Sequence, residues 1–235
     1  MAERKADSVK MDRLLTRNFF NLKGNEPFYQ LFMDSLYPWE ILSGIGTFIS
    51  ELGPALSPAD YEKRAEGVFV HRTAKIADYV TFLGPCIIGE GVEVRPGAFI
   101  RKNVYAGPGS VIGNSTELKN VILTGSVEVP HFNYVGDSIL SYGAHMGAGS
   151  ITSNLRADKG PVKVRLGERE IESGLRKFGA MISEHAEVGC NAVLNPGTML
   201  GRESLVYPLS SVRVSVPAFH IHKNDGSISR KRAGA

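Results

Sequence analysis

The segment 130–138 holds the residues of this sequence best suited to proton transfer. His131 and Tyr134 form an H-x-x-Y-x-G-D motif that ends at Asp137. An imidazole has an ordinary pKa of about 6.5, so it can accept or release a proton near neutral pH. Downstream, residues 147–154 read G-A-G-S-I-T-S-N. The backbone N–H groups of such a glycine-rich stretch could stabilise an oxyanion.

Basic residues on either side of this stretch could bind an anion. Arg95 begins an R-P-G-A run and Lys119 ends an E-L-K run. An arginine guanidinium can hold a phosphate through two hydrogen bonds. The segment 153–177 adds a set of further cations: Arg156, Lys159, Lys163, Arg165, Arg169, Arg176 and Lys177. Such a run is often only a solvated surface, so its role in binding stays open.

The candidate residues interrupt a regular repeat that must position them. Apolar residues recur every six positions from Val70 to Leu118 and again from Ile182 to Val212. A step of six fits neither a helix nor a single strand. It predicts a triangular solenoid in which each hexapeptide is a short strand and a corner, and three of them form a coil. The 26 glycines among 235 residues fit many tight corners. A β-sandwich with coincidental spacing is the alternative.

The repeat fails in places, and the failures suggest a domain plan. Between Leu118 and Ile182 the phase slips, and residues 153–177 read as an inserted loop. Residues 1–66 lack the repeat and predict a helical cap over the N-terminal end of the solenoid, with one helix starting at Ser57. The β-helix domain is expected over 67–220. Residues 221–235 are expected to form a flexible basic tail.

Composition excludes several classes of protein. The net charge of +3 does not favour nucleic-acid binding. No apolar stretch reaches the length of a membrane span, and the N-terminus lacks a signal-peptide core. With two cysteines, a disulfide framework is not expected, and a cytoplasmic location follows as the expectation. Neither a membrane nor a nucleic acid is expected as a partner.

Taken in order, the R-P-G-A, E-L-K, H-x-x-Y-x-G-D and G-A-G-S-I-T-S-N motifs resemble a known family over residues 70–215. They resemble the acetyltransferase domain of bifunctional UDP-N-acetylglucosamine pyrophosphorylases, which are also glucosamine-1-phosphate acetyltransferases. They also resemble the corresponding domain of archaeal sugar-1-phosphate nucleotidylyltransferases. The resemblance implies a mainly β fold, a left-handed parallel β-helix with a short N-terminal helical region, assembled as a homotrimer. It implies acetyl-CoA as acyl donor, no required metal, and an amino-sugar phosphate of the glucosamine-1-phosphate or galactosamine-1-phosphate type as N-acetyl acceptor.

The resemblance also implies roles for individual residues. His131 matches the general base. On chemical grounds alone, Glu117 is expected to be a partner of its ring. The expected catalytic residues are His131, Tyr134 and His145. The expected substrate-binding residues, with Tyr134 also contacting the sugar phosphate, are Arg95, Lys119, Lys159 and Lys163. The expected contacts to acetyl-CoA are Ala148 and Asn154.

Three features depart from the family pattern. His145 stands where bifunctional members have an asparagine, which puts the choice of acceptor in doubt. The interval from Arg95 to Lys119 is one hexapeptide longer, so Arg101 competes with Arg95 for the phosphate. The nucleotidyltransferase loop is absent from residues 1–66, so uridylyl transfer is not expected.

Other functions stay open at the level of sequence. One is a non-catalytic scaffold or sensor that binds a sugar nucleotide. Another is an O-acyltransferase acting on a different sugar. A third is a metal-dependent lyase of the carbonic anhydrase type, with ligands from His131, His145 and His185.

Overall fold

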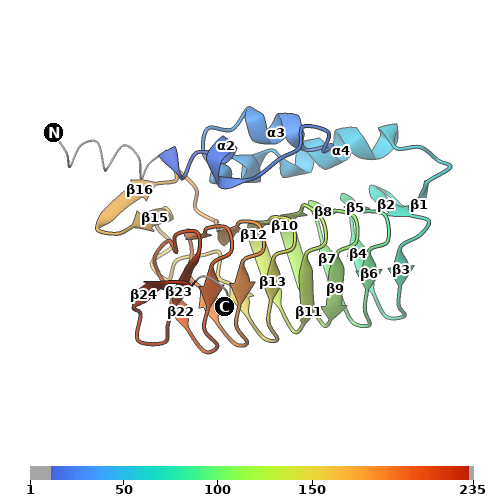
Figure 1. The fold of residues 1–235 in the computed structure, drawn as a ribbon. Coiled ribbons are helices and arrows are strands. Elements are labelled where there is room, and N and C mark those ends of the chain that lie inside the picture. The colour runs from blue at the N-terminus through green and yellow to red at the C-terminus, as the bar shows by residue number, and fades with distance from the viewer. Residues whose placement is uncertain (1–11, 233–235) are drawn as a thin grey trace.

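The computed structural model describes residues 12–232, which form a three-sided parallel β-helix with helices along one side (Figure 1). This is the mainly β, left-handed parallel β-helix that the family resemblance implies. Parallel strands of neighbouring coils pair along each side. We number the sides in the order in which the chain visits them.

Short strands build each side, and two long strands turn a corner between sides. Side one contains β2 (Val68–His71), β5 (Cys86–Ile88), β8 (Val104–Ala106), the second halves of β10 (Glu117–Leu123) and β12 (Tyr134–Leu140), β17 (Ala180–Ile182) and β20 (Thr198–Leu200). Side two contains β3 (Lys75–Ile76), β6 (Glu93–Val94), β9 (Val111–Asn114), β11 (Glu128–His131), β13 (His145–Met146), β18 (Glu187–Val188), β21 (Leu205–Val206) and β23 (His220–His222). Side three contains β4 (Thr81–Leu83), β7 (Phe99–Arg101), the first halves of β10 and β12, β14 (Ile151–Thr152), β19 (Val193–Leu194) and β22 (Ser211–Val212).

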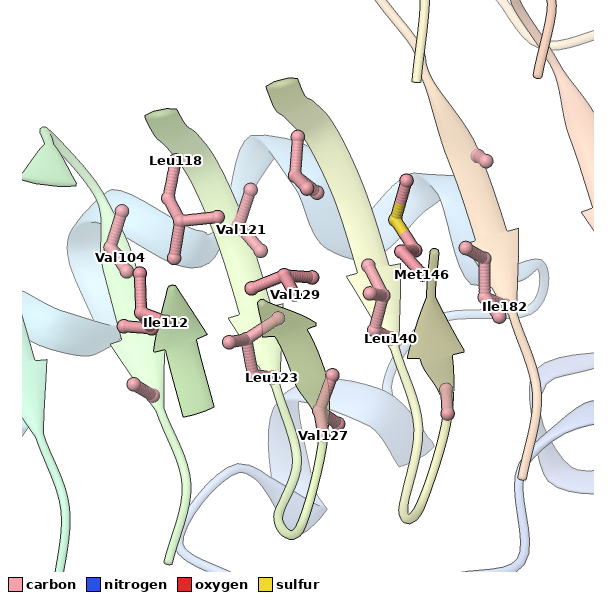
Figure 2. Close-up of a cluster of buried hydrophobic side chains, with 14 of the residues drawn as sticks. Val104, Ile112, Leu118, Val121, Leu123, Val127, Val129, Leu140, Met146 and Ile182 are labelled. Atoms are coloured by element: carbon pink, nitrogen blue, oxygen red, sulfur yellow. The ribbon is translucent and has the colours of Figure 1, made fainter. Parts of the chain in front are cut away.

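The interior of the prism is a stack of aliphatic side chains (Figure 2). Ile88, Val94 and Ile100 of one coil are buried, as are Ala106, Ile112 and Leu118 of the next. These are residues of the period-six series, so that series forms the inward face of the prism.

The phase slip of the repeat arises at one corner, between sides three and one. The coil that contains β7 and β8 turns this corner through two residues with positive φ, Lys102 and Asn103. The next two coils use only one such residue each, Asn120 and then Asp137. Asn103, Asn120 and Asp137 are therefore spaced by 17 residues, whereas Thr73 and Gly91 on earlier coils are spaced by 18. Each of these two coils is therefore one residue shorter than the earlier ones, and the same side chains still point into the prism.

The N-terminal helices lie along side one of the prism (Figure 1). They are α2 (Thr16–Phe19), α3 (Tyr29–Met33), the 3₁₀ helix η1 (Pro38–Ser43) and α4 (Ile45–Ala55). The predicted cap over the N-terminal end is therefore wrong, because this helical layer follows the length of the solenoid. It buries a row of outward-facing residues: Ile87, Tyr105, Ile122, Ile139, Met181 and Met199.

Strand pairing, instead of a helix, covers the first coil. β1 (Tyr61–Ala65) runs antiparallel to β2 and so pairs the edge of side one. The predicted helix start at Ser57 is also wrong. Residues 57–60 form a turn, in which the backbone N–H groups of Asp60 and Tyr61 donate to the Ser57 carbonyl.

Two further segments are more ordered than the sequence suggests. The insertion after β14 contains a hairpin of β15 (Lys163–Leu166) and β16 (Arg169–Glu172). Its Val162 and Val164 are buried together with residues of the helical layer. The expected flexible tail instead pairs β23 with β24 (Ile228–Arg230) in antiparallel register. Its last three residues lie outside the described part of the chain.

Candidate functional site

A cavity of about 410 Å³ lies at the corner between sides two and three. His131, at the end of β11, and His145, in β13, both line it. The remaining lining residues are Arg95, Val111, Glu128, Pro130, Gly147, Ala148 and Cys190. Four residues predicted from the sequence thus meet here: Arg95, His131, His145 and Ala148.

His131 is fixed through its backbone, and its ring is exposed. Its N–H donates to the Asn133 side-chain oxygen at 3.0 Å, and its carbonyl accepts from the Gly149 N–H at 2.9 Å. Buried Asn133 also donates to the carbonyl oxygens of Gly147 and Ser150. Within residues 12–232 the His131 ring has no hydrogen-bond partner, and the expected one, Glu117, binds elsewhere. The imidazole therefore faces the cavity from a strand end that two backbone hydrogen bonds hold in place.

His145 has a partner that holds its ring. Its Nδ1 lies 2.8 Å from a carboxylate oxygen of Glu187 on the next coil. Glu128 on the preceding coil is in direct register with His145, which is in direct register with Glu187. One imidazole therefore lies in a row between two carboxylate-bearing residues.

Arg95, and not Arg101, is the arginine that lines the cavity. Its Nε lies 2.7 Å from a carboxylate oxygen of Glu93. Arg101 is on side three, where its guanidinium lies 2.9 Å from the Glu117 carboxylate. One extra hexapeptide turns the chain by one side of the prism. Arg95 therefore lies at the end of side two, whereas Lys119 lies at the end of side three.

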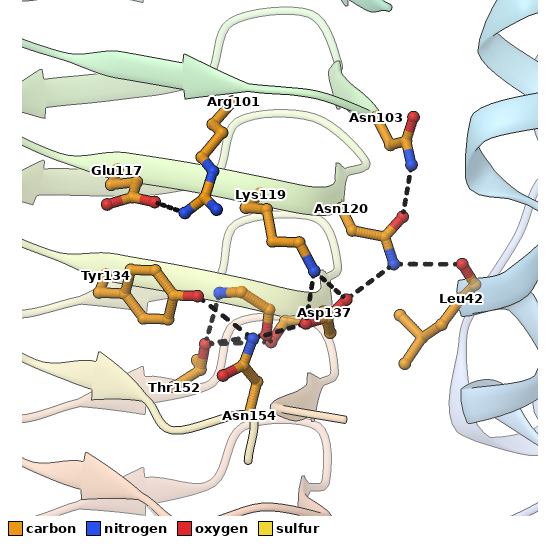
Figure 3. Close-up of polar contacts among 12 residues, drawn as sticks. Leu42, Arg101, Asn103, Glu117, Lys119, Asn120, Tyr134, Asp137, Thr152 and Asn154 are labelled. Atoms are coloured by element: carbon orange, nitrogen blue, oxygen red, sulfur yellow. Dashed lines mark hydrogen bonds and ion pairs between the residues drawn. The ribbon is translucent and has the colours of Figure 1, made fainter. Parts of the chain in front are cut away.

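Three other predicted residues, Lys119, Tyr134 and Asn154, gather around Asp137 at the corner between sides three and one (Figure 3). Lys119 Nζ lies 3.0 and 3.1 Å from the two Asp137 oxygens. Asn120 and Asn154 also donate to this carboxylate. Asp137 is only 4% exposed, and these donors compensate the loss of water around it. Lys119 and Asn154 thus serve an internal polar network in the isolated chain.

Tyr134 belongs to the same network. Its hydroxyl accepts a hydrogen bond from Asn154 at 3.2 Å. Burial raises the pKa of the Tyr134 phenol, and the negative charges of Asp137 and Glu117 add to the effect. The phenol is therefore protonated at neutral pH, so it can donate a hydrogen bond but is no base there.

The two lysines of the insertion do not line the cavity. Lys163 in β15 lies 3.0 Å from Glu170 of β16. Lys159 is exposed at a turn, where its N–H donates to the Arg156 carbonyl. In the isolated chain the predicted residues therefore form three groups: the cavity, the Asp137 network and the insertion.

Sequence reasoning missed Glu128, Glu187 and Cys190. Each lies on side two or at its corner, one coil before or after a predicted residue. The register between coils could have revealed them, since residues that pair on neighbouring coils point in the same direction. The inserted segment hides that register between His145 and Glu187.

No metal-binding group is found in the described part of the chain. Among residues 12–232, no three His, Cys, Asp or Glu side chains gather as metal ligands would. His185, the third histidine considered from the sequence, packs edge-to-face on Tyr142 at 5.6 Å between ring centroids. It does not line the cavity of His131 and His145. None of the helices in residues 12–232 is long and apolar enough to span a membrane.

Comparison with curated proteins confirms the resemblance that the motifs predict. The chain is 31% identical over 215 residues to the bifunctional protein GlmU of Methanococcus vannielii, covering 83% of this chain and 48% of the relative. It is 33% identical over 159 residues to a bifunctional sugar-1-phosphate nucleotidylyltransferase/acetyltransferase of Sulfurisphaera tokodaii, covering 60% of this chain and 40% of that one. The chain thus spans about half the length of such relatives, or less. No protein-family model matches it.

Solved structures with some likeness include two acetyltransferases. One is the acetyltransferase domain of PglB from Neisseria gonorrhoeae in complex with acetyl coenzyme A. It has 15% identity and a TM-score of 0.36, over 70% of this chain and 57% of that one. The other is a point mutant of GDP-perosamine N-acetyl transferase from Caulobacter crescentus, in complex with CoA and GDP-perosamine. It has 18% identity and a TM-score of 0.37, over 69% of this chain and 56% of that one.

Proposed function

We propose that this chain, homologous to part of the bifunctional sugar-1-phosphate nucleotidylyltransferase/acetyltransferases, is an acetyl-CoA-dependent N-acetyltransferase of an amino-sugar phosphate. Glucosamine-1-phosphate and galactosamine-1-phosphate are the acceptor types that the family resemblance favours. One observation carries the proposal: His131 and His145 share a cavity with the Gly147–Ala148 backbone. Acyl transfer from a thioester needs a proton acceptor and an oxyanion donor near one carbon atom.

His131 is the proposed general base. As the acceptor nitrogen attacks the thioester carbonyl, a C–N bond forms and the nitrogen must lose a proton. The imidazole takes that proton and returns it to the departing CoA thiolate when the C–S bond breaks. Its ring has no protein partner in the described chain, so it can meet the acceptor directly. General acid–base catalysis of this kind typically contributes about 10²–10⁴-fold in rate.

The Ala148 N–H is the proposed donor to the thioester oxygen. Its neighbours are already used, because the Gly147 N–H donates to the Val188 carbonyl and the Gly149 N–H donates to the His131 carbonyl. The Ala148 N–H has no acceptor within residues 12–232. A fixed backbone donor stabilises a developing negative charge without reorganising. This supports the expected contact between Ala148 and acetyl-CoA.

Arg95 is the proposed cation for the acceptor phosphate. It lines the cavity, and Glu93 holds its Nε while the other guanidinium nitrogens have no hydrogen bond within the described chain. A guanidinium held on one edge can still bind a phosphate with the other. Lys119 is already bound to Asp137, so Arg95 is better placed for this role.

The insertion is proposed to serve a neighbouring subunit of a homotrimer. Lys159 and Lys163 do not line the cavity of their own chain, although the resemblance implies that both bind the acceptor. An adjacent prism could accept them at its own cavity. Light scattering is expected to give the mass of three chains. A mass of one chain would contradict this arrangement.

The function is tested with purified protein, acetyl-CoA and a panel of amino-sugar phosphates. Loss of thioester absorbance and mass spectrometry of the acceptor report acetyl transfer. We expect turnover with at least one acceptor, and a loss on the order of 10²–10⁴-fold in His131→Ala. His220→Ala, a substitution on side two away from the cavity, is the matched control. Binding without turnover would favour the sensor alternative.

A further inference from the structure

A row of ionisable side chains crosses side two at the edge of the cavity. Glu128 of β11, His145 of β13 and Glu187 of β18 follow one another in direct register on consecutive coils. Glu187 lies 2.8 Å from His145 Nδ1, and Glu128 and His145 both line the cavity. The side chains of His145 and Glu187 are 34% and 49% exposed, so a ligand can reach them.

The charges in this row suit a cation better than an anion. Arg95 is the only Lys or Arg lining the described cavity, and Glu93 lies 2.7 Å from it. Glu128 and Glu187 therefore leave the His145 end of the cavity negative at neutral pH. Such a region attracts ammonium groups and repels phosphates. An amino sugar carries its ammonium group on the atom that must be acylated.

We propose that Glu128, His145 and Glu187 form a subsite that binds the acceptor as an ammonium ion and removes its first proton. This inference rests on the proposed acetyl transfer and assigns its acceptor to the class of protonated primary amines. Glu128 contacts the ammonium group, and His145 accepts the proton. Glu187 is a positioning residue that holds Nδ1 and stabilises the imidazolium, while the other ring nitrogen faces the acceptor.

Counting protons supports the pairing of this row with His131. An ammonium acceptor and acetyl-CoA give an amide, CoA thiol and one proton released to solvent. Two N–H protons therefore leave the nitrogen, one before attack and one after the C–N bond forms. A hydroxyl acceptor loses only one, which passes to the thiolate. The cavity holds two imidazoles, so His145 can take the first proton to solvent and His131 can pass the second to sulfur.

The key experiment compares His145→Ala with wild type across pH. Amines of this kind have a pKa of about 8, so the acceptor is mainly protonated at pH 7 and mainly free base at pH 9. About a tenth of the acceptor is free base at pH 7, so we expect kcat/KM of the variant to fall about tenfold at pH 7, and the deficit to shrink at pH 9. A hydroxylamino analogue of the acceptor is unprotonated at neutral pH and should bypass the defect. The charged or titratable groups facing His145 are Glu187, Glu128, His131, Arg95 and Cys190, and all are retained.

Two carboxylate variants separate binding from proton transfer. Glu128→Gln removes a charge-assisted contact and is expected to raise KM for the amine about tenfold with little change in kcat. Glu187→Gln is expected to lower kcat/KM about tenfold at pH 7, because the imidazolium loses its partner. Glu51→Gln on the exposed face of α4 and His220→Ala are the controls.

The results of these experiments distinguish failure of the ammonium subsite from failure of the proposed acetyl transfer. If wild type acetylates no amino sugar, the proposed function fails. If wild type is active but His145→Ala loses the same factor at pH 7, at pH 9 and with the hydroxylamino acceptor, the ring is only structural and the subsite is refuted. An unchanged KM in Glu128→Gln would also overturn the ammonium assignment.

Discussion

Lys119 and Asp137 are 18 residues apart in the chain and meet on neighbouring coils, where the ammonium group lies 3.0 and 3.1 Å from the two carboxylate oxygens. Asp137 is the last residue of the H-x-x-Y-x-G-D motif, and it occupies the corner where the coil loses one residue. The Gly179 N–H, where the insertion returns, donates to its carbonyl. This ion pair therefore anchors the corner from which the insertion leaves.

Replacing Asp137 should destabilise the fold more than an exposed aspartate does. Asp137→Ala leaves three donors without their acceptor and places alanine at a φ of +47°. We expect a loss of about 3 kcal/mol in the free energy of unfolding, measured by urea denaturation. Asp137→Asn should lose less, since asparagine tolerates this φ and still accepts a hydrogen bond. Equal stability of Asp137→Ala and the exposed control Asp78→Ala would contradict the role.

Adding a methyl group at Gly113 should disturb the site from a distance. A Cβ there would overlap the Pro130 backbone of the next coil, directly before His131. Overpacking against backbone typically costs about 1–3 kcal/mol, so we expect a loss near that upper value together with reduced acetyl transfer. Gly91→Ala is the comparison, because nothing lies within 4 Å and only its φ of +62° is strained. It should cost about 1 kcal/mol and leave activity intact.

The two cysteines should react with thiol reagents at very different rates. Cys86 is fully buried in the prism, and burial raises the pKa of its thiol to about 12. Cys190 is exposed and lines the cavity. We expect one thiol to be alkylated quickly in the native protein and two after denaturation, as counted by mass spectrometry. CoA should slow the fast reaction, and Cys190→Ser should abolish it.

Acidification should loosen the C-terminal end of the prism. His222 in β23 is buried, and burial lowers the pKa of its imidazole. Below an ordinary pKa of 6.5 the unfolded chain takes up a proton that folded His222 resists. Its contribution to stability is thus present above pH 6.5 and is lost as the pH falls through the lowered pKa. Once exchange rates are divided by the intrinsic rates at each pH, protection of the amides in residues 220–230 should fall between pH 7 and pH 5, and less so in His222→Leu. His220→Leu should leave that fall unchanged.

The coils could be predicted from sequence because each hexapeptide repeats the same packing problem. Ile88 and Val94 face inward for the same reason as Ile182 and Val188, so the interior follows from spacing alone. The single-residue corners at Asn120 and Asp137 were not predicted, since only the backbone shows that one residue with positive φ replaces two. That change also hid the ion pair between Lys119 and Asp137.

The sequence did contain a sign that helices cover side one, but it lies in residues outside the inward-facing period-six series. Ile87, Tyr105 and Ile122 follow their inward neighbours and point outward, where polar residues would face water. An apolar outward row on one side predicts a cover for that side. Likewise, His131 could be singled out by motif, but the pairing of His145 with Glu187 could not, because the insertion separates their coils in sequence.

The helical layer also changes how the prism should come apart. In a bare solenoid each coil contacts only its neighbours, so end coils can fray one at a time. Here the carbonyl of Phe19 accepts from Ser183 near one end, while α4 packs on β5 and β8 near the other. A single covalent segment thus ties coils distant along the axis into one cooperative unit. When an end coil unfolds, the helical layer also loses its contacts with the coils beside it. Unfolding at either end of the prism therefore destabilises the cavity in the middle.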